Sequence, residues 1–190
     1  MDTFADMLCH VAEYARHPRS IGAIIPSSRA LARTMTESVP HLGKRDVIIE
    51  LGPGTGAITR AIVTAWPRNR VIAVEKNARL AAMLRQRFPR VDVAETCVSN
   101  IAHDLIPKGY RVGAVLSSLP MLSFDESMRR RVLAAVCGLL DRRAVYVQFT
   151  YSRAAWDGFT PEGLQLVGTR RVMRNLPPAT ILSFVKHASA

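Results

Sequence analysis

The sequence from residue 47 to residue 60 reads Val-Ile-Ile-Glu-Leu-Gly-Pro-Gly-Thr-Gly-Ala-Ile-Thr-Arg. An apolar run that ends in an acid predicts a buried strand, and the pattern after Gly56 predicts a helix. Gly52, Gly54 and Gly56 can adopt positive φ and let a ligand approach the backbone closely. Such a turn points backbone N–H groups, at the positive end of a helix, toward a bound group. The stretch therefore predicts a strand, a tight turn and a helix, with a small-molecule site at the turn.

Strands and helices alternate on both sides of this turn. Helices are predicted over residues 28–39, 56–66, 77–87 and 125–140, after an amphipathic helix that ends before Pro18. Strands are predicted over residues 46–51, 70–75, 91–96, 111–117, 143–150, 163–173 and 179–187. This order indicates an α/β fold with a seven-stranded, mostly parallel sheet, one antiparallel strand at its end, helices on both faces and an N-terminal helical extension. We expect one domain over residues 1–190, with N-terminal helices over 1–40 and the core over 41–190.

The composition excludes several classes of protein. Three cysteines without a CxxC pair and five scattered histidines predict neither a disulfide framework nor a metal site. No apolar run is long enough for a transmembrane helix, and the first residues do not resemble a signal peptide, so a cytoplasmic location is expected. A net charge of +11 favours nucleic acid or an anionic membrane surface as partner, although a genome rich in arginine codons would give the same charge.

The glycine turn and a second acid indicate the class of ligand. The spacing is GxGxG rather than the GxGxxG of dinucleotide-binding proteins, and no phosphate-binding GK[ST] motif is present. Glu75 ends the second predicted strand, where a carboxylate can accept hydrogen bonds from two ribose hydroxyls. Both nicotinamide and adenosyl cofactors offer such hydroxyls. Glu50 within the motif suits a cofactor with an ammonium and a sulfonium better than a pyrophosphate.

Glu-Leu-Gly-Pro-Gly-Thr-Gly resembles motif I of the class I S-adenosylmethionine-dependent methyltransferases, which have a Rossmann-like fold. The resemblance implies S-adenosyl-L-methionine as cofactor, with the glycines on its methionine part and the acid of the second strand on its ribose. Many of these enzymes bind the adenine amine with an Asp after the third strand, which is absent here. Ser99 or Asn100 is expected to replace it, unless this segment is an ordinary loop. The implied cofactor-binding residues are Glu50, Gly52, Gly54, Gly56, Glu75, Lys76, Ser99, Asn100 and Ser117.

Two related groups of methyltransferases resemble the chain beyond the cofactor motif. The ribosomal RNA adenine dimethylases carry Asn-Leu-Pro-Tyr or similar after the fourth strand, where Asn binds the target amine and the aromatic ring stacks on a flipped base. The corresponding sequence here is Leu-Ser-Ser-Leu-Pro-Met, so Ser118 and Met121 replace those two residues. Both replacements argue against recognition of a base.

The bacterial phospholipid N-methyltransferases resemble the chain over nearly its whole length. The similar segments, beside motif I, are residues 17–32 (HPRSIGAIIPSSRALA), 116–120 (LSSLP), 148–151 (QFTY) and 175–179 (NLPPA). The resemblance implies successive methylation of phosphatidylethanolamine toward phosphatidylcholine by an enzyme that binds membranes peripherally. An RNA or DNA adenine methyltransferase, and a non-catalytic membrane- or nucleic-acid-binding module, remain the alternatives.

Methyl transfer to an amine requires residues that orient a deprotonated nitrogen. The backbone carbonyls of Ser117 and Ser118 and the hydroxyl of Tyr151 are the candidates, with Tyr14 as a weaker one from the N-terminal helix. Tyrosine rings also attract the cation that forms as methylation proceeds.

The phosphate of a lipid substrate requires a cationic partner. Ser28 and Arg29 at a predicted helix start combine N–H groups, a hydroxyl and a guanidinium, and the same residues would suit the cofactor carboxylate. Arg171 and Arg174 near the last strands are alternatives. The first helix is expected to lie in the membrane interface, to cover the cofactor, or both. We thus expect a phospholipid and the inner face of the cell membrane as partners, no nucleic-acid substrate and no obligate protein partner.

Overall fold

A computed structural model describes residues 28–101, 105–152, 162–175 and 177–187. Its α-helices are α2 (Arg29–Glu37), α3 (Ala57–Ala65), α4 (Ala78–Arg87) and α5 (Glu126–Leu139), and two short 3-10 helices are η1 (Val98–Asn100) and η3 (Met121–Ser123). Its strands are β1 (Asp46–Leu51), β2 (Arg70–Val74), β3 (Asp92–Ala94), β4 (Arg111–Ser117), β5 (Val145–Thr150), β6 (Leu164–Val172) and β7 (Ala179–Lys186). Every predicted element that falls within these residues is present. The helix predicted before Pro18, which carries Tyr14, lies outside the described residues.

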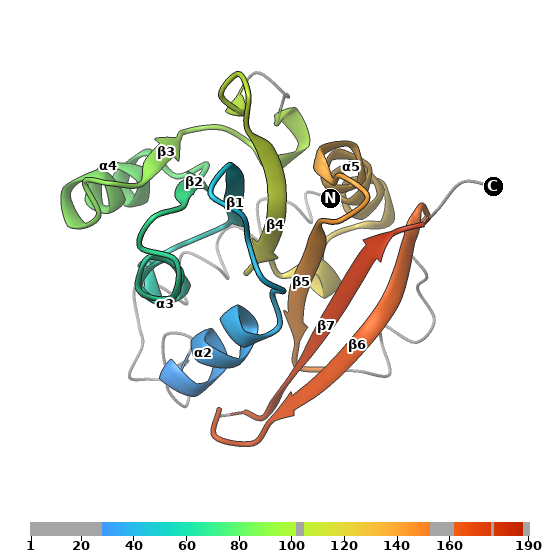
Figure 1. Ribbon diagram of the computed structural model, residues 1–190. Helices are drawn as coiled ribbons and strands as arrows, with labels where there is room; N and C mark the ends of the chain where they lie inside the picture. The colour runs from blue at the N-terminus through green and yellow to red at the C-terminus, as the bar shows by residue number, and fades with distance from the viewer. Residues whose placement is uncertain (1–27, 102–104, 153–161, 176, 188–190) are drawn as a thin grey trace, which may run out of the picture.

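The strands form one seven-stranded sheet in the order β3-β2-β1-β4-β5-β7-β6 (Figure 1). Strands β1 to β5 are paired in parallel, whereas β7 is antiparallel to both β5 and β6. The prediction of a mostly parallel sheet with one antiparallel strand is therefore confirmed. Because β6 consequently runs in the same direction as β5, the carboxyl ends of β1 to β6 share one edge of the sheet. We call this the carboxyl edge.

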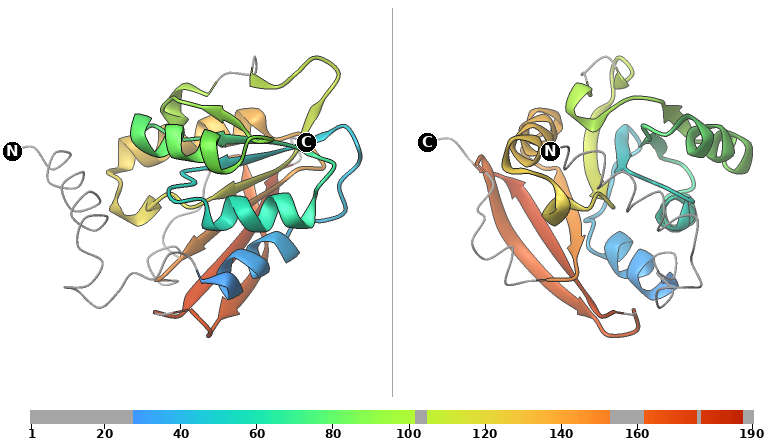
Figure 2. Two further views of the ribbon diagram at one scale, coloured as in Figure 1. Left: turned by 90° about the vertical axis from the view of Figure 1, so that its left-hand side faces the viewer. Right: turned by 180° about the vertical axis from the view of Figure 1, so that it is seen from behind.

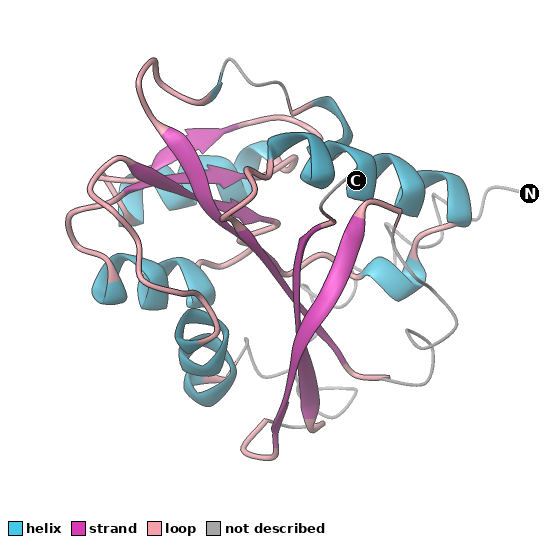
Figure 3. Cartoon of the chain, turned by 45° about the vertical axis from the view of Figure 1, so that its right-hand side comes forward, coloured by secondary structure: helices cyan, strands magenta, loops and turns pink. Residues whose placement is uncertain are grey.

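Helices cover both faces of the sheet, as predicted (Figures 2 and 3). On one face, α2, α3 and α4 bury Leu31, Ile62 and Leu84 against Ile48 of β1. On the other face, α5 buries Val132, Leu133 and Val136 against Val47 and Ile49 of the same strand. All six residues of β1 are buried because they alternate between these two cores. Burial of each such side chain stabilises the fold by about 2 kcal/mol.

Three of the helices begin at side-chain caps, and α3 does not. Ser28, Asn77 and Asp125 accept hydrogen bonds from backbone N–H groups in the first turns of α2, α4 and α5. Helix α3 instead starts at Gly56, whose φ is +81° and which offers no side-chain cap. The tight turn after β1 thus leads directly into the helix.

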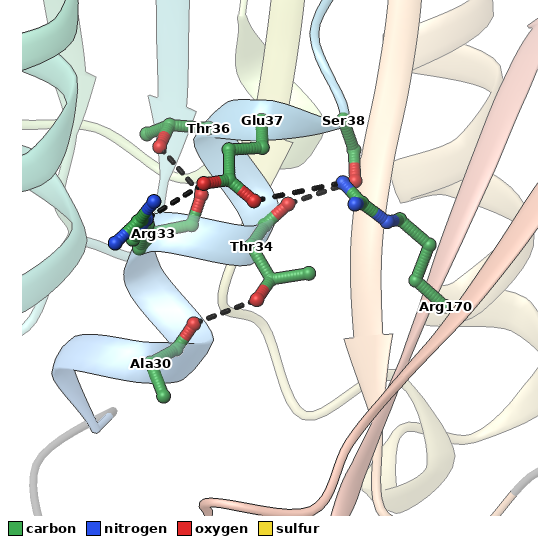
Figure 4. A network of polar contacts seen from close by, with 7 residues as sticks. All are labelled: Ala30, Arg33, Thr34, Thr36, Glu37, Ser38 and Arg170. Atoms are coloured by element: carbon green, nitrogen blue, oxygen red, sulfur yellow. Dashed lines mark hydrogen bonds and ion pairs between the residues drawn. The ribbon is translucent and has the colours of Figure 1, made fainter.

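Helix α2 is attached to the last two strands (Figure 4). Glu37 forms ion pairs with Arg33 at 2.6 Å and with Arg170 of β6 at 3.8 Å. At the other end of the helix, Ser28 N donates to Asn175 Oδ1 at 3.2 Å across 147 residues of sequence. Because Asn175 lies in the turn between β6 and β7, this bond holds the start of α2 at the carboxyl edge.

Candidate cofactor and acceptor site

The three glycines of the turn after β1 have different surroundings, although all have positive φ (+67°, +55° and +81°). A Cβ atom on Gly52 would lie 2.8 Å from Leu119 Cδ2, and one on Gly56 would lie 2.5 Å from Phe88 Cε2. A Cβ atom on Gly54 would meet nothing within 4 Å. Packing therefore requires glycine at the two outer positions, whereas Gly54 faces open space in which a ligand can lie against the backbone.

Glu75 follows β2 and is hydrogen-bonded to this turn. Its Oε2 accepts a hydrogen bond from Gly54 N at 3.2 Å, and its Oε1 accepts one from Asn77 N at 2.9 Å. A carboxylate has about four acceptor positions. The two remaining positions are available to a pair of ribose hydroxyls beside the glycine turn.

Glu50 lies at the same point of the sheet and is completely buried. Within the described residues, neither of its carboxylate oxygens has a hydrogen-bond partner, and the same holds for Thr59 Oγ1 in the first turn of α3. Burial raises the pKa of Glu50 to about 7 and the charge of Glu75 adds to this rise, whereas the nearby hydroxyl and backbone N–H of Thr59 lower the pKa in part. A buried carboxylate beneath the glycine turn, without a hydrogen bond of normal geometry, is an arrangement that fits a ligand with positive charge.

The segment after β4 lies directly beside the glycine turn. Ser118 N donates to Leu51 O at 2.9 Å, so this segment continues the pairing of β4 with β1. Ser117 is fully buried, and its Oγ accepts a hydrogen bond from Leu119 N at 3.3 Å. Met121 is 2% exposed and packs in the core under α5. We call residues 117–120 the acceptor loop.

Tyr151 lies at the same edge, immediately after β5. Its side chain is 47% exposed, and its ring meets that of Phe149 edge-on at a centroid distance of 5.5 Å. The register pairs Gln148 of β5 with Ser117 of β4, the first residue of the acceptor loop. Tyr151 therefore lies three residues beyond the position of β5 that is paired with this loop. The structure therefore brings Ser117, Ser118 and Tyr151 to one region.

Ser99 and Asn100 form η1 beyond the end of β3. Ser99 Oγ lies 3.1 Å from both Cys97 Sγ and Asn100 Oδ1. The pKa of Cys97 is lowered, since the Ser99 hydrogen bonds and the charges of Lys76 and Arg131 outweigh the effect of burial. Glu75 N donates to Ala94 O at 3.0 Å, which connects the ends of β2 and β3. The residues predicted near ribose and adenine thus follow adjacent strands at the carboxyl edge.

The candidate anion-binding residues belong to segments near both ends of the chain, and one hydrogen bond joins these segments. The bond between Ser28 and Asn175 places Arg29 next to the turn that carries Arg174, and Arg171 lies near the end of β6. All three arginines are exposed. The polar groups of Ser28 are engaged within the protein, because its Oγ caps α2 and its N–H binds Asn175. An anion at this point would therefore depend on the guanidinium groups.

Sequence reasoning did not assign a role to Gln148, Leu119, Thr59 or Asn175. The signal for Gln148 was an uncharged polar residue inside an apolar strand, and for Asn175 it was a polar residue beside two prolines. Within the described residues there is no cluster of side chains suited to a metal ion. No helix among them combines the length and apolar character needed to cross a bilayer.

Comparison with known proteins defines the class and the family. No protein-family model matches the chain. Magnesium protoporphyrin IX methyltransferase from Synechocystis, solved with bound S-adenosylmethionine, shares the fold at a TM-score of 0.66 and 11% identity, over 98% of both chains. Ribosomal RNA small subunit methyltransferase A of Acidobacterium capsulatum is 30% identical over 136 residues. These residues make up 70% of this chain but only 46% of that protein.

Sheet order, glycine turn and the two acids thus define a class I methyltransferase that uses S-adenosyl-L-methionine. Ornithine lipid N-methyltransferase of Singulisphaera acidiphila is 31% identical over 92% of this chain and 93% of its own length. The chain belongs to the family of this lipid N-methyltransferase.

Proposed function

We propose that the protein transfers methyl groups from S-adenosyl-L-methionine to the primary amine of a zwitterionic amino lipid at a membrane surface. The sequence signatures pointed to phosphatidylethanolamine, and the relative of near-equal length is named for ornithine lipid. The two head groups share an amine with an anionic group a few bonds away, a phosphate in one and a carboxylate in the other. A site that holds an ammonium and an anion together would suit both.

The observation that carries the choice of a lipid over a nucleic acid is the burial of Met121. At the position where a base-stacking aromatic ring would follow the fourth strand, this chain has a thioether that is 2% exposed and packed under α5. Enzymes that act on a flipped base stack it between aromatic or apolar side chains that line the pocket. A side chain buried in the core cannot stack on a base, and the match to ribosomal RNA methyltransferase A covers less than half of that protein.

The residues at the carboxyl edge have distinct roles in this proposal. When bound, the cofactor supplies the activated methyl group. Glu75 accepts hydrogen bonds from the ribose hydroxyls, Gly54 permits close approach, and Glu50 offsets positive charge. The backbone carbonyls of Ser117 and Ser118 and the Tyr151 hydroxyl orient the lipid nitrogen for in-line attack. A lipid ammonium, with a pKa near the value of about 10 for lysine, loses its proton to water before it reacts.

The outer part of the same edge suits a lipid head group and an anionic surface. Arg171 and Arg174 flank Met173 in the sequence, and Arg29 follows Ser28, which is bonded to Asn175. Met173 is 64% exposed and is the most exposed large apolar side chain among the described residues. We call Met173 and these three arginines the basic rim. Arginines near an anionic membrane each contribute about 1 kcal/mol to binding. Peripheral association with the inner face of the cell membrane, through this edge, is part of the proposal.

The experiment supplies labelled S-adenosylmethionine to the purified protein with three separate acceptors. These are vesicles that contain ornithine lipid, vesicles that contain phosphatidylethanolamine, and unmodified ribosomal RNA. Label in the organic extract of either vesicle supports the proposal, and the two arms identify the head group. Label in RNA alone would overturn it. Label in none of them, together with no cofactor binding by calorimetry, would instead support a non-catalytic module.

A further inference from the structure

Gln148 is an uncharged amide buried in the middle of β5. Its side chain is 1% exposed within the sequence Val-Tyr-Val-Gln-Phe-Thr. Nε2 donates to Leu119 O at 3.0 Å and to Phe149 O at 2.7 Å, and Oε1 accepts a hydrogen bond from Tyr146 Oη at 2.8 Å. Both amide hydrogens are therefore used. Burial of a polar side chain is costly unless its groups are paired in this way.

Leu119 connects this amide to the cofactor turn. Its carbonyl accepts from Gln148 Nε2 and from Met121 N, and its own N–H donates to Ser117 Oγ. Its side chain packs directly over Gly52, since a Cβ atom there would lie 2.8 Å from Leu119 Cδ2. The backbone of Leu119 is thus held by β5, while its side chain contacts the glycine turn. Leu119 therefore links β5 to the glycine turn, in addition to the bond from Ser118 N to Leu51 O.

We propose that Gln148 is a positioning residue that fixes the acceptor loop, residues 117–120, against the glycine turn, residues 52–56. It thereby sets the geometry between methyl donor and acceptor amine. This inference rests on the proposed methyltransferase function but not on the identity of the lipid. An error of about 1 Å in the placement of reacting atoms can reduce a rate by about 100-fold. Because Gln148 is 1% exposed and its amide is hydrogen-bonded within the protein, its loss is expected to reduce turnover more than cofactor affinity.

The test compares Gln148→Leu with wild type and with Gln165→Leu, a matched change at an exposed glutamine of β6. Leucine is similar in size to glutamine but leaves Leu119 O and Phe149 O without their side-chain donor. We expect kcat with the preferred lipid vesicle to fall by about 100-fold, while the Kd for S-adenosylmethionine by calorimetry stays within about threefold, a change of under about 1 kcal/mol. Gln165→Leu is expected to change neither quantity.

A second variant, Gln148→Glu, adds a pH profile of kcat to the comparison. A protonated glutamic acid can still donate to Leu119 O, and an ionised one cannot. Since burial raises the pKa of a carboxyl group, the variant is expected to approach wild-type activity near pH 6. Its deficit relative to wild type should grow toward pH 9.

Amide hydrogen exchange of the cofactor-free protein provides a readout that needs no methyl acceptor. Gln148→Leu should accelerate exchange in residues 117–123 and leave β1 unchanged. Unchanged exchange there, or loss of cofactor affinity in parallel with kcat, would overturn the role of Gln148. A wild-type protein that methylates neither lipid would refute the proposed lipid substrate but would leave the exchange result as a valid test of this role.

Discussion

The backbone N–H of Gly54 donates a hydrogen bond of 3.2 Å to Glu75 Oε2, which joins the turn after β1 to the end of β2. The same carboxylate also accepts from Asn77 N at 2.9 Å. Glu75 therefore orders the glycine turn and presents its remaining lone pairs beside Gly54, the glycine of this turn that faces open space. This double role makes Glu75 the residue whose loss should most directly affect the cofactor.

Glu75→Ala is expected to weaken binding of S-adenosylmethionine by at least about 100-fold. Two hydrogen bonds from ribose to a charged acceptor contribute about 1.5–3 kcal/mol each, and the hydrogen bond from Gly54 N to Glu75 is lost as well. Isothermal titration calorimetry provides the measurement. Glu95→Ala is the matched control, because Glu95 is an exposed acid just beyond the adjacent strand and pairs only with Arg85 in the ion pairs described. Equal affinity in wild type and Glu75→Ala would show that the ribose lies elsewhere.

The glycines of the turn are expected to separate stability from binding. Gly56→Ala should destabilise the fold by several kcal/mol, because φ is +81° and the new Cβ would lie 2.5 Å from Phe88. Gly54→Ala should cost only about 1–2 kcal/mol of unfolding free energy, since nothing lies near its Cβ, but should lower cofactor affinity. Denaturant unfolding and calorimetry on both variants measure the two effects. A Gly54→Ala protein with normal affinity would contradict the assignment of the open space to the cofactor.

The stability of the cofactor-free protein is expected to decrease as the pH rises toward and through 7. Burial raises the pKa of Glu50 from 4.5 to about 7, so the folded state holds a proton that the unfolded state has already lost. The contribution of Glu50 is fully present below pH 4.5 and disappears above 7, a difference of roughly 3 kcal/mol at most. Glu50→Gln cannot ionise. Its melting temperature relative to wild type should therefore rise between pH 5 and pH 8, and a constant difference would refute the shifted pKa.

Cofactor binding is expected to show the opposite dependence on pH. The ionised form of Glu50 attracts a positively charged ligand, so the affinity of wild type for S-adenosylmethionine should increase from pH 6 to pH 8. Glu50→Gln should bind more weakly at pH 8 and show little change over this range. Calorimetry at the two values tests this, and a pH-independent wild-type affinity would separate Glu50 from the cofactor site.

The basic rim is expected to control attachment to anionic vesicles. Combined substitution Arg29→Glu and Arg174→Glu should reduce binding by more than about 10-fold, since each arginine contributes about 1 kcal/mol and each reversal adds repulsion. Met173→Asp should weaken binding further. Arg68→Glu, an exposed arginine between α3 and β2 at the opposite edge of the sheet, is the control. Vesicle sedimentation measures the effect, and equal losses in rim and control variants would indicate general charge attraction only.

Much of the fold could be predicted because local patterns agree with the tertiary structure. The alternation of apolar runs and amphipathic segments located the strands from β1 to β7, and the turn glycines located the start of α3. The third strand is shorter than predicted: residues 91–96 were expected, whereas β3 has only three residues. It is an edge strand that pairs with β2 alone, and the chain then turns into η1. The end of such a strand is set by its single neighbour rather than by its own sequence.

The parts of the site that could not be predicted depend on contacts between residues that are far apart in the sequence. Ser28 was a candidate for anion binding, yet its hydroxyl caps α2 and its N–H binds Asn175 at a separation of 147 residues. The positioning role proposed for Gln148 likewise depends on its hydrogen bond to Leu119, which is 29 residues earlier in the chain. Local patterns reveal which residues are polar and buried, but not which partner satisfies them.

The most direct test of lipid N-methylation is mass spectrometry of the lipids recovered after incubation with S-adenosylmethionine. Vesicles would contain ornithine lipid and phosphatidylethanolamine together, and unmodified ribosomal RNA would be present in the same tube. The prediction is that one amino lipid gains the mass of one or more methyl groups with wild type and gains none with Glu75→Ala. Methylated RNA with unmodified lipids would contradict the proposed function.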